Sequence, residues 1–404
     1  MRIAYVCSDP GVPIFGTKGA AIHVRELCRA LSAVGHEVLI LSPRGDGDRP
    51  PGFDVRVETI RVRPHEAAAR LDQAVANDLR ALRCATALFE QGLSILRAFR
   101  PDIVYERYSL FGTGGSALAA ELDVPLIVEV NAPLSDEQRA HRELALVEAA
   151  RRLERDVLRS ADRIVTVSRA LERWLVGLGV EAHRIAVVAN GVDVARFRLA
   201  PNGDATVRAR LGLEGEPVVG FVGTLKTWHD VPTLIRAVAC LRETGRKARL
   251  LVVGDRPERS RLEELAVLEG LAGAAVFVGQ VPYEQVPAYL AAMAVAVAPY
   301  RADDDFYFSP LKLVEYLAAG RPVVAAAVGE IAHCIRPRET GLLYPPGNEQ
   351  ALAMGLAELL DDPGTAARQG LSGREHVRAF HTWEKNAHAV TELAAEALAT
   401  TAAT

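Results

Sequence analysis

The chain has 404 residues, enough for two or three domains that each bury their own hydrophobic core. Half of the residues are hydrophobic and 24% are charged, which is typical of a soluble globular protein. The formal net charge of −4 gives no basic field, and this argues against a nucleic-acid partner.

The five cysteines are scattered, without CxxC spacing or a ligand cluster, so the sequence predicts neither a zinc site nor a disulfide framework. This usage favours a reducing, cytoplasmic setting. The opening MRIAYVCSDPG is no signal peptide, and no apolar stretch has the length to span a bilayer. The Arg-rich stretches 66–98 and 139–159 allow at most peripheral membrane contact, because acidic residues interleave with the arginines.

Short β-branched runs alternate with helical stretches along the chain. In chain order the runs are RIAYVC, EVLIL, DIVYE, PLIVEV, RIVTVS, RIAVVA, VVGFVG, RLLVVG, AVFVG, VAVAPY and PVVAAA. Runs that are apolar throughout are typical of parallel strands covered on both faces. Helices are expected at 19–34, 139–159, 231–243 and 258–269. This alternation predicts an α/β protein with doubly wound sheets.

A stretch that is typical of a loop divides the first six strand-like runs from the last five. The stretch NGVDVARFRLAPNG follows the sixth run and contains two Asn-Gly pairs. We therefore expect one Rossmann-like domain at 1–200 and a second at 201–381, followed by an amphipathic stretch at 382–404. Ligands of such domains bind at the carboxyl ends of the strands.

Two glycine-containing loops follow predicted strands. Gly16 and Gly19 lie between the first strand and a helix, where a backbone can approach a phosphate; the alternative is a packing turn. The loop FVGTLKTWHD places Lys226 and His229 after Gly223, and either side chain could contact a phosphate. A lone loop lysine is more often simply solvated.

The third stretch, SPLKLVEYLAAG, follows the strand VAVAPY and an acidic loop. Ser309 is the expected N-cap and Pro310 the first helical residue. Lys312 and Glu315 then lie on one helical face, where the cation could hold phosphates and the carboxylate a ribose. The alternative is an ordinary intrahelical ion pair.

Six motifs in this order resemble the glycosyltransferases of family 4: KGAAIHVRELCRAL, ADRIVTVS, NGVDVARF, FVGTLKTWHD, SPLKLVEYLAAGRPVVA and ETGLLYPPGN. The resemblance covers nearly the whole chain. It implies a GT-B fold of two facing Rossmann-like domains with an inter-domain cleft. The first domain, with the crossing helix 382–404, would bind the acceptor, and the second would bind the donor.

The resemblance also implies an activity: retaining transfer from a nucleotide-diphosphate sugar, with a UDP-sugar as the expected donor, to a hydroxyl acceptor, without a metal or another cofactor. In the family the carboxylate matching Glu315 holds the donor ribose, and the amides around Ser309 to Leu311 hold the diphosphate. The donor-binding set that we predict is Gly16, Gly19, Gly223, Thr224, Lys226, His229, Ser309, Pro310, Leu311, Lys312 and Glu315.

The sequence departs from the family pattern. Tyr307 stands where the first Glu of the Glu-x7-Glu motif is usual, and Asp305 is the nearest carboxylate. Thr224 replaces a common Arg, and Asn131 replaces a common His. The candidate catalytic set is Asn131, His23 and Asp305, although His23 could equally be a packing residue. Glu106 and Arg107 could orient a substrate or form a structural ion pair.

Two other functions fit the same fold. One is a nucleotide-sugar epimerase, for which a carboxylate and histidine set would be expected. The other is a non-catalytic nucleotide-sugar-binding subunit, which the missing Glu makes more plausible. The expected acceptor is a hydroxyl of a saccharide, a lipid-linked sugar or a natural product.

Overall fold

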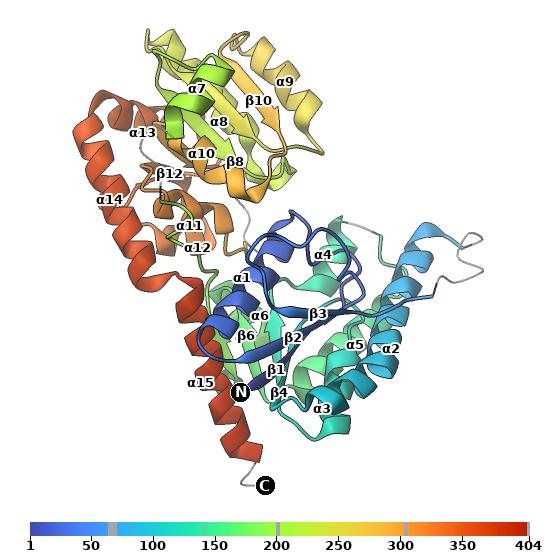
Figure 1. The fold of residues 1–404 in the computed structure, drawn as a ribbon. Coiled ribbons are helices and arrows are strands. Elements are labelled where there is room, and N and C mark those ends of the chain that lie inside the picture. Colours follow the sequence, from blue (N-terminus) through green and yellow to red (C-terminus); the bar gives the residue numbers. More distant parts are fainter. Residues whose placement is uncertain (64–70, 142, 199–202, 303–305, 402–404) are drawn as a thin grey trace. The chain divides into compact units, whose positions relative to one another are not determined.

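The computed structural model describes residues 1–404 except 64–70, 142, 199–202, 303–305 and 402–404. The chain forms two compact units (Figure 1). Unit 1 comprises Met1–Ala189 and Trp383–Thr404, and unit 2 comprises Asn190–Thr382. Each unit is built on its own parallel sheet.

The sheet of unit 1 has seven strands in the order β3-β2-β1-β4-β5-β6-β7. All neighbouring strands are parallel. The order reverses direction between β1 and β4, as expected for a doubly wound sheet. The strands are β1 (Arg2–Cys7), β2 (Glu37–Ser42), β3 (Arg56–Thr59), β4 (Ile103–Arg107), β5 (Leu126–Val130), β6 (Arg163–Thr166) and β7 (Ile185–Val187).

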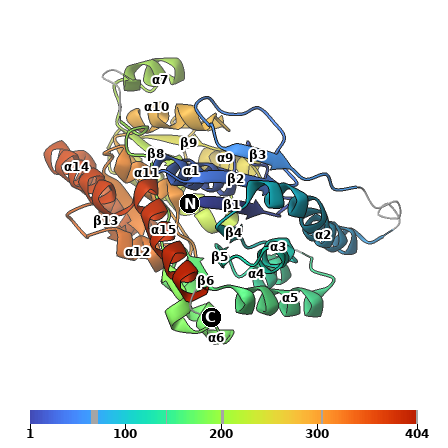
Figure 2. The ribbon, with the colours of Figure 1, turned by 60° about the horizontal axis from the view of Figure 1, so that its bottom comes forward.

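Helices connect these strands as parallel crossovers require. They are α1 (Gly19–Ala33), α2 (Gln73–Phe99), α3 (Gly114–Leu122), α4 (Leu134–His141), α5 (Val147–Ser160), α6 (Arg169–Gly177), the short 3-10 helix η2 (Ala182–Arg184) and the C-terminal α15 (Trp383–Thr401). Helix α15 packs against α1 and beside β6 (Figures 1 and 2). A hydrogen bond of 2.8 Å joins His36 Nε2 to Thr391 Oγ1 there.

The sheet of unit 2 has six parallel strands in the order β10-β9-β8-β11-β12-β13. They are β8 (Val218–Val222), β9 (Arg249–Val253), β10 (Ala275–Gly279), β11 (Val295–Ala298), β12 (Val323–Ala326) and β13 (Leu342–Tyr344). The helices are α7 (Gly203–Leu211), η3 (Thr227–His229), α8 (Val231–Glu243), α9 (Arg259–Leu268), η4 (Tyr283–Gln285), α10 (Val286–Ala291), α11 (Leu311–Ala318), α12 (Gly329–Cys334), α13 (Glu349–Asp361) and α14 (Pro363–Phe380).

The prediction of an α/β protein with two doubly wound domains is confirmed. The sequence missed two strands, β3 and β13. It also predicted one helix at 139–159, where α4 ends at His141 and α5 begins at Val147. The break has a tertiary cause, because the buried Asp78 carboxylate accepts the backbone N–H groups of Ala145 and Leu146, each at 2.9 Å.

The division between the units falls after Ala189, where the sequence predicted a boundary near residue 200. Among the described residues, no helix combines the length and the apolar character needed to cross a bilayer.

Candidate active site

In unit 1 a buried cluster forms around Glu129. Parallel pairing places Arg107, the last residue of β4, beside Glu129 of β5. Arg107 Nη1 lies 2.9 Å from Glu129 Oε1, and His23 Nε2 of helix α1 lies 2.8 Å from the same oxygen. The Tyr105 hydroxyl donates to Glu129 Oε2 at 2.7 Å. The Asn131 amide also donates to this carboxylate.

Glu129 is an anion that organises this cluster. Burial by itself would raise the pKa of its carboxyl, but His23 and Arg107 outweigh burial and hold that pKa well below its usual range. The structure therefore brings the two predicted residues, His23 and Asn131, together through a third that was not predicted. The sequence held a signal for it, because Glu129 is the one charged residue in the apolar run LIVEV.

Glu106 and Arg107 are not an ion pair with each other, because successive strand residues point to opposite faces. Arg107 joins the Glu129 cluster, whereas Glu106 accepts a hydrogen bond of 3.2 Å from the backbone N–H of Gly115. Burial raises the pKa of Glu106 to about 8, although hydrogen bonds from the Gly115 and Ser116 backbones oppose the change.

The glycine-containing loop before α1 is held by a buried arginine. Arg25 Nη1 donates to the carbonyls of Ile14 and Gly16, at 2.5 and 2.7 Å. The Gly16 N–H donates to the Pro13 carbonyl at 2.9 Å. Gly19 is the first residue of α1, so the loop that was predicted to approach a phosphate is fixed at the N-terminus of that helix.

In unit 2 helix α11 begins one residue later than predicted. Pro310 is its N-cap and adopts an extended backbone, and no side chain caps the helix. The prediction that Ser309 is the cap is therefore wrong. The Ser309 hydroxyl instead accepts the backbone N–H of Asn190 at 3.0 Å, and the Ser309 carbonyl accepts the Asn190 side-chain amide at 2.6 Å. Asn190 thus fixes the segment that leads into α11.

Lys312 is buried among aromatic rings at the first turn of α11. Its side chain donates to the Tyr300 hydroxyl at 3.1 Å, and its Nζ lies 4.9 Å from the ring centres of both Phe221 and Tyr300. Burial lowers the pKa of Lys312 to about 7, against the effect of Glu315. Gly223 has a φ of +151°, and a side chain there would meet Lys312 Cε at 2.8 Å. Glycine is therefore required beside this lysine.

Glu315 is also buried, and it lies one helical turn after Lys312. Its carboxylate Oε1 accepts a hydrogen bond of 3.0 Å from the Tyr283 hydroxyl. Lys312 and Glu315 thus share a helical face, as the sequence predicted, and aromatic residues from other elements surround them.

The loop after β8 presents Thr224, Lys226 and His229. His229 Nδ1 lies 2.5 Å from the Thr224 carbonyl. Burial and the nearby Lys312 charge hold the pKa of His229 well below its usual range, so at neutral pH this ring offers a hydrogen bond but no positive charge. Lys226 Nζ lies 5.2 Å from the ring centre of Trp228. Asp305, the third candidate catalytic residue, lies outside the described residues.

Comparison with known proteins identifies the class. The family described as Glycosyltransferase Family 4 matches residues 17–196, and the family described as Glycosyl transferases group 1 matches residues 216–362. A D-inositol 3-phosphate glycosyltransferase of Acidothermus cellulolyticus is 31% identical and covers 97% of this chain and 87% of its own. A GDP-mannose-dependent alpha-mannosyltransferase of Mycobacterium tuberculosis is 30% identical and covers 93% of each chain.

The chain belongs to family 4 of the glycosyltransferases, and it is a glycosyltransferase. The solved structure of sucrose-phosphate synthase from Thermosynechococcus elongatus superposes with a TM-score of 0.77 at 25% identity, over 99% of each chain. The GT-B fold that the sequence predicted is therefore confirmed.

Proposed function

We propose that this glycosyltransferase moves a sugar from a nucleotide-diphosphate donor to a hydroxyl acceptor with retention of anomeric configuration. The observation that carries the proposal is the buried pair Lys312 and Glu315 on the first turns of α11. An anionic diphosphate would restore the full charge of a lysine whose pKa is lowered to about 7 by burial. The neighbouring carboxylate suits a pair of ribose hydroxyls.

The proposed donor contacts lie at two places in unit 2, the start of α11 and the loop after β8. The N–H groups of Ser309 and Leu311 and the Lys312 ammonium would hold the diphosphate, with Pro310 between them setting the start of α11, since helix N-termini favour anions. Gly223 lets the β8 loop come close to Lys312. Thr224 and Lys226 would contact the phosphates from that loop, and His229 would contribute a neutral hydrogen bond.

Unit 1 would supply the acceptor contacts. The Glu129 carboxylate orients the His23 ring and the Asn131 amide, and both can then meet hydroxyl groups of the acceptor or of the donor sugar. Gly16 and Gly19 would bring the loop before α1 close to the donor phosphates. Asp305 remains the proposed substitute for the first Glu of the family motif.

The proposed chemistry is front-side displacement. The bond from the anomeric carbon to the donor phosphate breaks, and the acceptor oxygen bonds to the same face of that carbon. The acceptor proton passes to the departing diphosphate. The residues above bind and orient the reactants and stabilise charge, so the reaction needs no dedicated strong base and, in our proposal, no metal.

The relatives weigh against the two alternatives, because those reported above are named as sugar transferases. They do not fix the base of the donor, since one of them is named for GDP-mannose. UDP stays our first candidate, and the cytoplasm our proposed compartment; the five cysteines are free thiols, as a reducing setting requires.

Thermal melting tests the donor site. We expect UDP or GDP at about 100 times its Kd to raise the melting midpoint of unit 2 by roughly 5–10 °C, because the ligand binds only the folded protein. Glu315→Ala should lose most of this shift. Glu264→Ala removes an exposed carboxylate on α9 of the same unit and should keep it. A wild type without any shift, or a Glu315→Ala protein with the full shift, contradicts the proposed site.

A further inference from the structure

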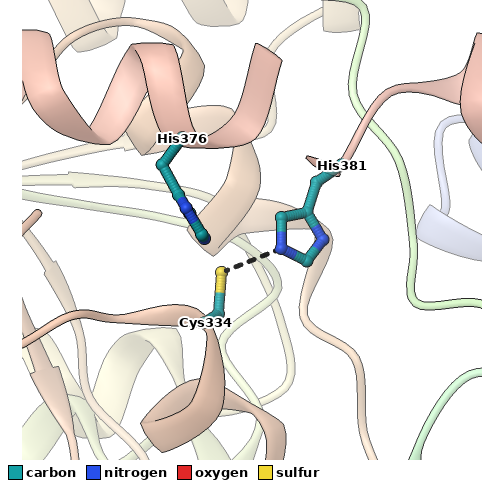
Figure 3. Close-up of side chains that lie close together, drawn as sticks. All are labelled: Cys334, His376 and His381. Carbon is teal, nitrogen blue, oxygen red and sulfur yellow. Dashed lines mark hydrogen bonds between the residues drawn. The ribbon is translucent and has the colours of Figure 1, made fainter. Parts of the chain in front are cut away.

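The side chains of one cysteine and two histidines of unit 2 lie close together (Figure 3). The ligand atoms of Cys334, His376 and His381 all lie within 4.8 Å of one another. Cys334 Sγ and His381 Nε2 are 4.0 Å apart. Cys334 lies 47 residues from His381 in the chain, so the sequence spacing from which no ligand cluster was expected does not reveal this proximity.

The ends of two helices create this cluster. Cys334 is the last residue of α12, and His376 lies near the end of α14. On a continuous helix, residues five apart point about 140° away from each other. Helix α14 ends at Phe380, however, and His381 leaves it with φ −130° and ψ 55°. This turn brings the His381 ring back beside His376 and Cys334 (Figure 3).

One nitrogen of this cluster is buried without a hydrogen-bond partner among the described residues. His376 Nδ1 is buried and makes no hydrogen bond to any described residue. Such a group costs free energy unless something binds it. A metal ion is one partner that could bind it, because imidazole nitrogens are common protein ligands of transition metals.

The thiol is not set up as a nucleophile. Burial raises the pKa of Cys334 to about 12, and the Glu330 carboxylate adds to that effect. A reactive cysteine needs the opposite environment, one that stabilises the thiolate. A metal ion could still bind this sulfur, because it displaces the thiol proton to solvent as it coordinates.

We propose that Cys334, His376 and His381 bind a divalent transition-metal ion of the zinc class. A thiolate with two imidazoles is a donor set that zinc prefers, and two histidines separated by four residues fall within its usual ligand spacing. Tetrahedral zinc would require the sulfur and nitrogen atoms to be about 3.5 Å apart. The 4.0 Å between Cys334 and His381 is close to that separation, so small side-chain rotations close the site. The fourth position is open to water.

The ion would tie together segments that are distant in sequence. The His381 carbonyl accepts the Val192 N–H at 2.9 Å, and Val192 pairs with Thr382 in a parallel bridge. Val192 lies just after the start of unit 2 and Thr382 is its last residue. Metal binding would therefore link α12 to the first and the last segments of unit 2. It should stabilise this unit against unfolding.

A Co²⁺ titration of full-length, tag-free, metal-stripped protein tests the proposal. We expect about one Co²⁺ per chain, with a thiolate-to-metal charge-transfer band in the near ultraviolet and the visible bands of a tetrahedral ion. Zn²⁺ should displace the Co²⁺ and erase both signals. A wild type that binds no stoichiometric Co²⁺, or binds it without the charge-transfer band, overturns the proposal.

Matched variants assign the ligands. Cys334→Ser should lose the charge-transfer band, and His376→Gln should weaken Co²⁺ binding by about 100-fold or more. His333→Gln alters the exposed histidine next to Cys334, and Cys240→Ser alters the free thiol that is not buried; both should bind as the wild type does. Unchanged Co²⁺ spectra in Cys334→Ser would overturn the assignment. Circular dichroism checks that each variant is folded. If a variant does not fold, the Co²⁺ titration of the wild type still tests whether the metal site exists.

Discussion

At the scale of single residues, the feature that costs most free energy if it is left without partners is the buried charge of Glu129. Its carboxylate is almost fully buried, and two basic side chains and two neutral donors satisfy it. Such an arrangement is tolerated only when each charge keeps its partner. The cluster should therefore be rigid, and its stability should depend strongly on the carboxylate.

Glu129→Gln should destabilise the protein by about 3–5 kcal/mol, because it leaves the Arg107 guanidinium buried without a counter-charge. Urea unfolding measures the change. Glu37→Gln is the matched control, since Glu37 pairs with Arg2 at 3.2 Å but its side chain is 63% exposed. That variant should lose no more than about 1 kcal/mol. Equal losses in the two variants would show that Glu129 is not a buried structural anion.

Glu106 makes the stability depend on pH in the opposite direction from an ordinary ion pair. Its pKa in the folded protein is about 8, above the value of an unfolded glutamate. Between these two values the folded chain holds a proton that the unfolded chain has released. Stability therefore falls as pH rises from about 4.5 to 8, by at most about 1.4 kcal/mol for each pH unit.

Glu106→Gln removes this titration and keeps a side-chain oxygen for the Gly115 N–H. We expect the variant to lose less stability than the wild type between pH 5.5 and 8.5, when both are unfolded in urea at each pH. Comparing the two proteins cancels the titration of all other groups. Identical pH slopes would mean that the Glu106 carboxyl is ionised in the folded protein across this range.

At the scale of elements, helix α11 carries the proposed donor site. One tyrosine of this helix forms hydrogen bonds to strand β8. The buried Tyr316 hydroxyl accepts the Val222 N–H at 2.7 Å and donates to the Val222 carbonyl at 3.0 Å. Val222 is the last residue of β8, and Gly223 follows it. The same side chain therefore sets the position of α11 relative to the loop that contacts Lys312.

Tyr316→Phe should cost about 1–3 kcal/mol, because it leaves two buried backbone groups of Val222 without their partner. It should also weaken nucleotide binding, since α11 would no longer be held in position relative to the loop after β8. Urea unfolding and nucleotide titration measure the two effects. Tyr289→Phe, which removes a hydroxyl that accepts from Arg210 on α7, tests whether any tyrosine hydroxyl of this unit has the same effect. Nucleotide binding as weak in Tyr289→Phe as in Tyr316→Phe would contradict this role.

The elements also show what a sequence can and cannot predict. Continuous apolar runs located β1 and β8, because parallel strands that are covered on both faces consist mainly of apolar residues. Strand β3 was missed because RVET is polar and partly exposed at the edge of the sheet. The break between α4 and α5 was missed because Asp78, which accepts the freed amides, belongs to a different helix.

The candidate site divides in the same way. Lys312 and Glu315 were found because they follow a strand and share a helical face. The predicted role of Ser309 as the N-cap was wrong, because its hydrogen-bond partner, Asn190, is 119 residues away in the chain. Glu129 gave only the weak signal of one charge inside an apolar strand. Cys334 and its two histidines gave none, since only the tertiary fold brings them together.

At the scale of the whole molecule, the chain joins two Rossmann-like units, each with its own chemistry. Unit 1 holds a cluster in which the Glu129 carboxylate orients a histidine and an amide, and unit 2 holds a buried lysine and carboxylate at the start of one helix. Family 4 membership makes sugar transfer the activity of the chain. The central claim is that the transfer uses a nucleotide-diphosphate sugar and retains the anomeric configuration.

Proton NMR of the donor without acceptor tests that claim most directly. The protein is mixed with UDP-glucose, UDP-N-acetylglucosamine or GDP-mannose, and the anomeric signals are recorded from the first minutes. We predict slow hydrolysis of one α-linked donor, with the α-anomer of the free sugar appearing first, and a rate about 100-fold lower in Glu315→Ala. Release of the β-anomer first, conversion of the donor to an epimer, or a panel of donors left intact would contradict the account.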